Sequence, residues 1–140
     1  MSVINDATSR YRAASEAKDI DAVMDALAPQ AELISPLSGR MAFRGAQDLR
    51  VLLAAIYGNL HQLHWHEEIG EGNLRVILGE ARVWGVTLTD AMVVELTEDG
   101  HIARIRPHLR PWLALTLLAI RLLPTIARHP GLVRRALRAA

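Results

Sequence analysis

The chain contains no cysteine, and only 4% of its 140 residues are aromatic. Without cysteine it has neither a disulfide framework nor a thiolate metal site, which fits a reducing compartment. It also lacks an apolar run of about 20 residues, the length that a membrane-spanning helix needs. The first residues show no basic stretch followed by an apolar one, so no secretory signal is predicted. We therefore expect a cytoplasmic protein.

Acidic residues are also missing from the C-terminal part of the chain. All 15 of them stand at or before Asp99, whereas eight of the 16 basic residues, all arginine, come after it. This asymmetry indicates that the C-terminal part meets an anionic surface: the chain's own acidic part, a partner or a membrane. The arginines are not interleaved with lysines and aromatics, so a nucleic acid is not the expected partner.

Periodicity along the chain predicts helices first and strands later. Helical spacing of apolar residues occurs at 6–17, from Ile20 to a stop at Pro29, and at 46–60. Strands are predicted at 31–35, 63–70, 74–84, 87–97 and 101–109. Helices that cover one face of an antiparallel sheet give an α+β architecture. A strongly curved sheet closing over a helix leaves a cavity, where small-molecule pockets tend to lie.

Short motifs accompany this layout. Tyr11 is followed by Asp19-Ile20-Asp21, Ala31-Glu32-Leu33-Ile34-Ser35-Pro36 and Phe43-Arg44-Gly45. Together they resemble the NTF2-like superfamily, and within it the SnoaL-like, ketosteroid isomerase and limonene epoxide hydrolase branch. The resemblance covers about residues 5–111 and includes the ending Arg110-Pro111. It implies an NTF2-like cone over residues 1–111 that encloses an apolar pocket, with residues 112–140 as an arginine-rich helical extension.

The catalytic set of ketosteroid isomerase is only partly matched. Such enzymes use a carboxylate base, a tyrosine and a protonated acid. On the resemblance, Tyr11 takes the place of the tyrosine, but Ser35 stands at the base position and Met92 at that of the protonated acid. Asp90 lies two residues from Met92 and so faces the same side of the strand. A serine is no general base at neutral pH without help, and isomerase chemistry of this kind is disfavoured.

The catalytic set of limonene epoxide hydrolase is matched less well. It combines an Arg-x-Asp pair with a second aspartate on the last strand. This chain keeps Arg82, but Trp84 replaces the acid of the pair and the second acid falls near Pro107. Water activation would lack its bases, so this reaction is disfavoured too.

Three side chains are candidates for acid–base chemistry: Tyr11, Asp90 and His108. Asp90 stands in an apolar strand, where a carboxylate either reaches solvent or is buried with a perturbed pKa. His108, with an ordinary pKa of about 6.5, is either a base beside arginines or a surface residue. His64 and His66 share a strand face without a third ligand, so no metal site is predicted. The expected pocket wall adds Ser35, Trp65, Arg82, Trp84 and Met92.

The tail is the unusual feature of the sequence. Residues 112–123 are almost wholly apolar, and the remainder of the tail is divided by Pro124 and by the break His129-Pro130-Gly131. Burying five or six leucine-type side chains contributes about 10 kcal/mol at ~2 kcal/mol each. Three burial sites compete: the mouth of the chain's own cavity, a homodimer interface, and a membrane surface contacted through residues 112–140.

Three functions stay open. The first is cofactor-free acid–base catalysis of the isomerase, cyclase or hydrolase type on a small hydrophobic molecule, with Tyr11 donating a hydrogen bond to a substrate oxygen. The second is a non-catalytic carrier or sensor, which the missing family acids favour. The third is a peripheral membrane or partner-binding protein that works through the tail. A homodimer is expected, and neither a metal nor an organic cofactor is implied.

Overall fold

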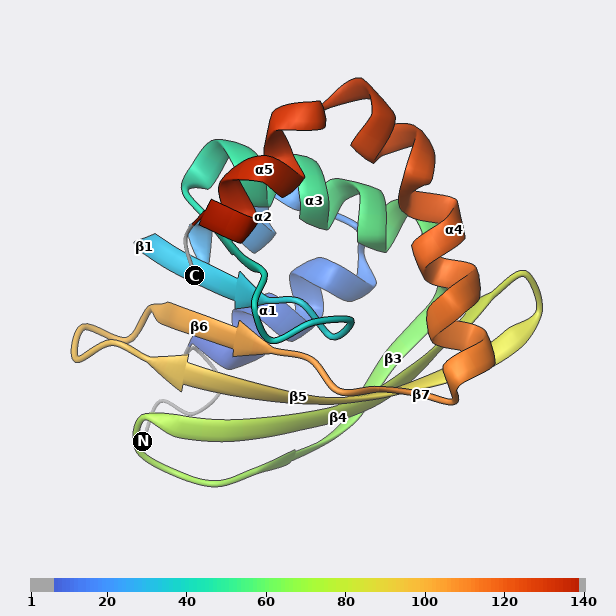
Figure 1. Ribbon diagram of the computed structural model, residues 1–140. Helices are drawn as coiled ribbons and strands as arrows, with labels where there is room; N and C mark the ends of the chain where they lie inside the picture. Colours follow the sequence, from blue (N-terminus) through green and yellow to red (C-terminus); the bar gives the residue numbers. More distant parts are fainter. Residues whose placement is uncertain (1–6, 139–140) are drawn as a thin grey trace.

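The computed structural model describes residues 7–138. Residues 1–6, the start of the predicted domain 1–111, and residues 139–140, the end of the predicted extension 112–140, lie outside the described part. The prediction that the chain starts without a secretory signal falls partly on these residues. The described part begins with two helices, two strands and a third helix. Five strands follow, and two helices come last (Figure 1). The elements are α1 (Ala7–Glu16), α2 (Ile20–Asp25), β1 (Leu27–Ile34), β2 (Ala42–Arg44), α3 (Ala46–Asn59), β3 (His61–Ile69), β4 (Leu74–Val83), β5 (Val86–Leu96), β6 (Ile102–Arg106), β7 (Leu109–Arg110), α4 (Trp112–Arg128) and α5 (Pro130–Arg138).

The strands form one curved sheet in the order β2-β1-β6-β5-β4-β3, and β7 pairs with β5. Among the strand pairs within residues 7–138, β1 and β6 run parallel to each other and the others are antiparallel. Helices α1 to α3 lie on one side of the sheet, which bends around them (Figure 1). This arrangement confirms the predicted α+β class with a curved sheet packed on N-terminal helices.

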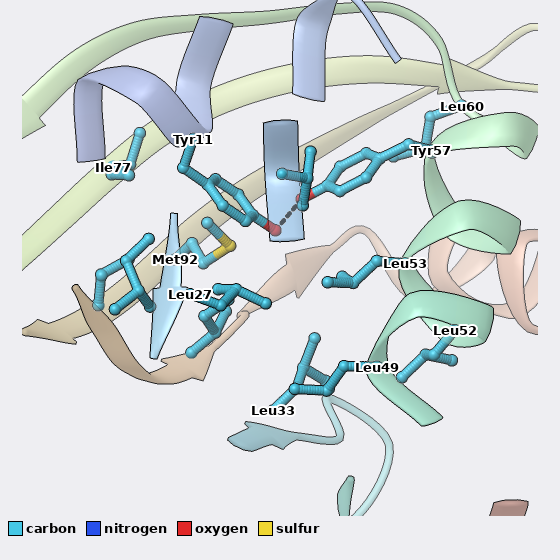
Figure 2. Close-up of a cluster of buried hydrophobic side chains, with 14 of the residues drawn as sticks. Tyr11, Leu27, Leu33, Leu49, Leu52, Leu53, Tyr57, Leu60, Ile77 and Met92 are labelled. Atoms are coloured by element: carbon cyan, nitrogen blue, oxygen red, sulfur yellow. Dashed lines mark hydrogen bonds between the residues drawn. The ribbon is translucent and has the colours of Figure 1, made fainter. Parts of the chain in front are cut away.

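The core lies between α3 and the sheet. Along β5, Leu88, Met92 and Val94 are buried, because alternate side chains of a strand point to the same side. Leu49 and Leu53 of α3 meet this inner face at helical spacing. Figure 2 shows the resulting cluster of apolar side chains, into which the rings of two tyrosines project.

Prolines are where the structure departs from the predicted elements. Pro29 does not end the second helix, which stops at Asp25; it lies within β1, where the register with β6 shifts. A residue without an N–H is tolerated in a strand at such an irregularity. Pro107 divides the last predicted strand into β6 and β7. Pro124 lies inside α4, where it removes the N–H donor to the carbonyl of Ile120, one turn earlier; both residues are on the exposed side of the helix.

Strand β2 is absent from the predicted elements. It has three residues, too few for an alternating pattern to stand out in the sequence. It pairs with β1 through Leu33 opposite Phe43, so it widens the sheet beside the N-terminal end of α3.

The tail packs on its own chain. Helix α4 contacts α3, β4, β5 and β7, and α5 contacts β2. Two side chains fix this position: Arg121 donates to Asn59 Oδ1 at 3.0 Å, and Arg135 donates to both carboxylate oxygens of Asp48 at 2.8 Å. Of the three predicted burial sites, the inner face of the tail therefore occupies the mouth of the chain's own cavity. Among the described helices, none is both long and apolar enough to cross a bilayer.

Candidate ligand pocket and its polar cluster

A cavity of about 110 Å³ lies between α3, the sheet and α4. One water molecule needs roughly 10–15 Å³ of such space, so the cavity has room for a small organic molecule. Its wall is largely apolar and is drawn from every layer of the fold: Leu33 and Phe43 from the sheet edge, Leu53 and Ile56 from α3, Leu88 and Met92 from β5, Leu115, Leu118 and Leu122 from α4, and Val133 from α5. The tail thus supplies one side of the pocket.

Two tyrosines from different helices meet in this wall. The hydroxyl of Tyr11 on α1 is hydrogen-bonded to that of Tyr57 on α3, as the dashed line in Figure 2 shows. The rings stand edge to face, with centroids 6.1 Å apart and an interplanar angle of 71°. Burial raises the pKa of both hydroxyls well above its ordinary value. Both tyrosines are therefore neutral, and the pair can donate a hydrogen bond to a ligand oxygen.

Asp90 on β5 is the carboxyl group of the cluster. Burial raises its pKa to about 7, although the backbone N–H of His108 lowers the value in part. Its Oδ1 is the one buried side-chain oxygen or nitrogen that lacks a hydrogen-bond partner within residues 7–138. A carboxyl group with this pKa gives up and takes back a proton near neutral pH.

The three groups belong to one cluster. Besides burial, the negative charge of Asp90 contributes to the raised pKa of both Tyr11 and Tyr57. All three residues line the cavity. The arrangement can hold the oxygen of an apolar molecule at the tyrosine hydroxyls and exchange a proton through Asp90.

Trp65 supports the cluster from β3. Its indole N–H donates to Ser15 Oγ at 2.9 Å, and Ser15 Oγ in turn donates to the carbonyl oxygen of Tyr11 at 2.8 Å. The ring packs on Gly79 of β4, the residue directly opposite Asp90, so closely that a Cβ there would lie 2.5 Å from Trp65 Cε3. The absent side chain of Gly79 leaves room for the indole beside Asp90, where it helps to exclude water.

The other residues expected in the pocket divide into two groups. Ser35 and Met92 are buried and line the cavity, as Trp65 does. The hydroxyl of Ser35 accepts a hydrogen bond from the backbone N–H of Leu37 at 3.1 Å.

Arg82 and Trp84, in contrast, lie outside the cavity wall. The inner face of β4 consists of Ala81, Val83 and the odd-numbered residues before them, so Arg82 points to the other face and donates to the Gly85 carbonyl at 2.9 Å. Trp84 is in the β4–β5 turn with a positive φ of 48°, and its ring meets the guanidinium of Arg121.

His108 also lies outside the wall. It comes directly after the break at Pro107, its side chain is exposed, and its Nδ1 lies 3.1 Å from the carbonyl oxygen of Ala91. Only its backbone reaches the cluster, through the effect of its N–H on Asp90. The structure therefore brings Tyr11 and Asp90 together and leaves the imidazole apart from them.

Sequence reasoning missed Tyr57, whose position predicts only an ordinary helix residue. It falls on the apolar stripe of α3, where a phenol ring packs like any other large side chain. The feature that could have identified it as a site residue is its hydroxyl group, because a tyrosine buried on such a stripe needs a hydrogen-bond partner.

Possible metal ligands are dispersed. Residues 7–138 contain no group of three or more His, Asp or Glu side chains placed to hold a metal ion. His64 instead lies near Glu16, with 3.5 Å between Nδ1 and Oε2, and both His64 and His66 are exposed.

Comparison with known proteins gives a family and a fold. The model of the SnoaL-like domain matches residues 8–105. The chain matches no functionally curated protein sequence.

Several solved structures resemble most of this chain. An uncharacterized protein with a cystatin-like fold from Silicibacter pomeroyi superposes with a TM-score of 0.84 at 16% identity over 93% of each chain. A steroid delta-isomerase from Pseudomonas aeruginosa gives 0.79 at 19% identity, covering 89% of this chain and 92% of that one. An NTF-2 like protein of unknown function from Burkholderia xenovorans gives 0.66 at 23% identity, over 74% and 79%. At these identities the likeness establishes the fold.

Proposed function

Since the chain belongs to the SnoaL-like domain family, we propose that it binds a small apolar molecule carrying a carbonyl or enol oxygen and catalyses proton transfer next to that oxygen. The observation that carries this proposal is the convergence of three polar groups, Tyr11, Tyr57 and Asp90, in an otherwise apolar cavity. A pocket built only to hold a hydrocarbon gains nothing from a buried carboxyl group with one oxygen, Oδ1, that lacks a hydrogen-bond partner, because this costs stability.

Each member of the cluster has a distinct part in the proposed reaction. A carbon–hydrogen bond next to the ligand carbonyl breaks, and its proton passes to the carboxylate of Asp90. The electron pair moves onto the ligand oxygen, where the Tyr11–Tyr57 pair stabilises the enolate with the one hydroxyl hydrogen that is not used between the two tyrosines. Asp90 then returns the proton to the same or another carbon, and the second choice gives an isomer. No cofactor enters this sequence.

The pKa of Asp90 suits this part. A group that accepts and returns a proton works best when its pKa is near the operating pH, and burial raises that of Asp90 to about 7. The fold likeness to a steroid delta-isomerase agrees with a reaction of the isomerase type. At the position where the resemblance places the ketosteroid isomerase base, this chain has Ser35, so Asp90 would act as the proton carrier in its stead.

The experiment uses 2-tetralone, an apolar bicyclic ketone with exchangeable protons, as the probe. In heavy water we expect the protein to accelerate deuterium incorporation next to the carbonyl, measured by NMR. Asp90→Asn removes the proton carrier and should slow the exchange by about 100-fold, the usual contribution of general acid–base catalysis. Glu98→Gln, a change at an exposed acid in the turn before β6, is the matched control and should leave the rate unchanged.

A non-catalytic carrier is the second candidate, and Ser35 is the observation that favours it. A carrier would bind 2-tetralone, as shown by ligand-induced shifts of the Trp65 indole signal, without accelerating exchange. Absence of both binding and exchange, for 2-tetralone and for 2-naphthol as an enol-like probe, would contradict both candidates.

A further inference from the structure

Before its last residue, Arg128, the water-facing side of α4 carries no charge. Its exposed positions before the last residue of the helix, called here the outer face, are Trp112, Leu113, Thr116, Ile120, Leu123, Pro124 and Ala127. Thr116 is the one polar member. Its hydroxyl group donates to the carbonyl oxygen of Trp112 at 2.7 Å, so this hydrogen bond lies within the helix. Trp112 is 75% exposed and Leu123 56%. A helix that faces water normally places charged residues on that side, so this face lacks the usual solvent-adapted surface.

Exposed arginines stand at both ends of α4 and on α5, the helix that follows it. Arg110 precedes α4, Arg128 ends it, and Arg134 and Arg138 are on α5; all four are exposed, and within the described residues none forms an ion pair. Arg135 differs, because Asp48 binds it. Since no acidic residue comes after Asp99 in the sequence, no acidic side chain of the tail neutralises these four groups.

We propose that the outer face of α4 and these four arginines dock the protein on an anionic phospholipid surface. The apolar side chains would enter the boundary between headgroups and acyl chains, and the guanidinium groups would bind lipid phosphates. Trp112 suits this boundary, where tryptophan rings are enriched.

Charge favours a lipid surface over a second copy of the chain. A two-fold contact of α4 with itself in antiparallel orientation would bring the arginines at its two ends together, so like charges would meet. An anionic bilayer offers the opposite charge along the whole face. This choice rests on the tail alone and does not depend on the proposed reaction.

Docking through the outer face of α4 would place the pocket close to the bilayer. The inner face of α4, with Leu115, Leu118 and Leu122, lines the cavity. The same helix would therefore separate the bilayer from the pocket, at the edge of the molecule where α4 lies in Figure 1. An apolar ligand dissolved in the bilayer would then be one helix away from its site.

The test is flotation of the full chain with vesicles of phosphatidylcholine alone or mixed three to one with phosphatidylglycerol. We expect binding to the mixed vesicles, weakening as salt is added, and little binding to the neutral ones. Leu123→Glu should weaken binding on the order of tenfold, because it removes buried apolar area and adds a repelled charge. The matched control is Leu74→Glu, at the far end of β4 from the tail, where the side chain is 55% exposed and the change should have no effect.

A second pair of variants keeps the test independent of the apolar change. Arg134→Gln and Arg138→Gln should each weaken binding about fivefold, the effect of losing one arginine near an anionic surface. Failure of the wild-type chain to float with the mixed vesicles at low salt would overturn the proposal. Equal losses for Leu74→Glu and Leu123→Glu would overturn it too. So would a dimer in sedimentation analysis that Leu123→Glu dissociates while no vesicle binding occurs, since a second copy would then cover the face.

Discussion

Two carboxyl groups of the sheet lie in opposite environments. Glu32 on β1 accepts hydrogen bonds from Arg44 Nε at 2.6 Å and from Arg104 Nε at 2.8 Å, and the hydrogen bond from Arg44 is the largest reason that its pKa is lowered. Asp90 on β5 has an oxygen without a partner, and burial raises its pKa to about 7. Three arginines of the sheet, Arg44 on β2 and Arg104 and Arg106 on β6, form ion pairs with Glu32 or Glu95.

The difference separates stabilising from functional chemistry. The ionised form of Glu32 is held by its neighbours, so the group contributes to the fold at neutral pH. The ionised form of Asp90 is disfavoured by burial, so the group weakens the fold at neutral pH and is ready to exchange a proton there. A carboxyl group retained at such a cost is the mark of a working site.

The largest effect expected from this comparison is that of Asp90→Asn on stability. Folded Asp90 keeps its proton up to about pH 7, whereas the unfolded chain loses it near pH 4, so stability falls as pH rises between these values. Removing the ionisable group should raise the free energy of unfolding at pH 8 by up to about 4 kcal/mol, at 1.36 kcal/mol per pKa unit. Urea denaturation at pH 4 to 8 should show the gain shrinking toward pH 4. A variant less stable than the wild type at pH 8 would show that Asp90 is paired and not strained.

The smaller expected effect is that of Glu32→Gln, which should lower the free energy of unfolding at neutral pH where Asp90→Asn raises it. The lowered pKa of Glu32 gives stability that is present above the ordinary pKa of glutamate and is lost as pH falls through the folded value. The two arginines are partly exposed and solvent screens them, so the variant should lose only about 1 kcal/mol at pH 7, and this loss should shrink as pH falls below the ordinary pKa of glutamate. The same urea series measures it, with Glu98→Gln as the unpaired control. A loss that persists unchanged at pH 3 would have a cause other than the ion pairs.

Much of the fold could be predicted from the sequence, because periodicity reports which side of an element is buried. The helices at 7–16 and 46–59 and the long hairpin of β4 and β5 lie where the pattern places them. The boundaries at prolines could not be predicted. Pro29 is accommodated by a strand irregularity and Pro124 on the exposed side of a helix, and neither leaves a mark in the sequence.

The site was less predictable for a physical reason. Asp90 stands out as the lone acid of an apolar strand, and the resemblance points to Tyr11. Tyr57 gives no such signal, because a pocket tyrosine and a core tyrosine share the same place in a helical stripe. Alternation along β4 puts Arg82 and Val83 on opposite faces, but it does not tell which face is inside. An apolar helix likewise indicates that it must be buried without indicating what covers it, so the tail was placed only by the structure.

The most direct test is the pKa of the Asp90 carboxyl group itself, measured by carbon-13 NMR of the labelled wild-type chain with Asp90→Asn to assign the signal. We predict a titration near pH 7 for Asp90, against one below the ordinary value for Glu32 in the same spectrum. We also predict that 2-naphthol, bound at the tyrosine hydroxyls, shifts the Asp90 titration. An Asp90 carboxyl that titrates near pH 4 and ignores 2-naphthol would contradict the proposed role of this group.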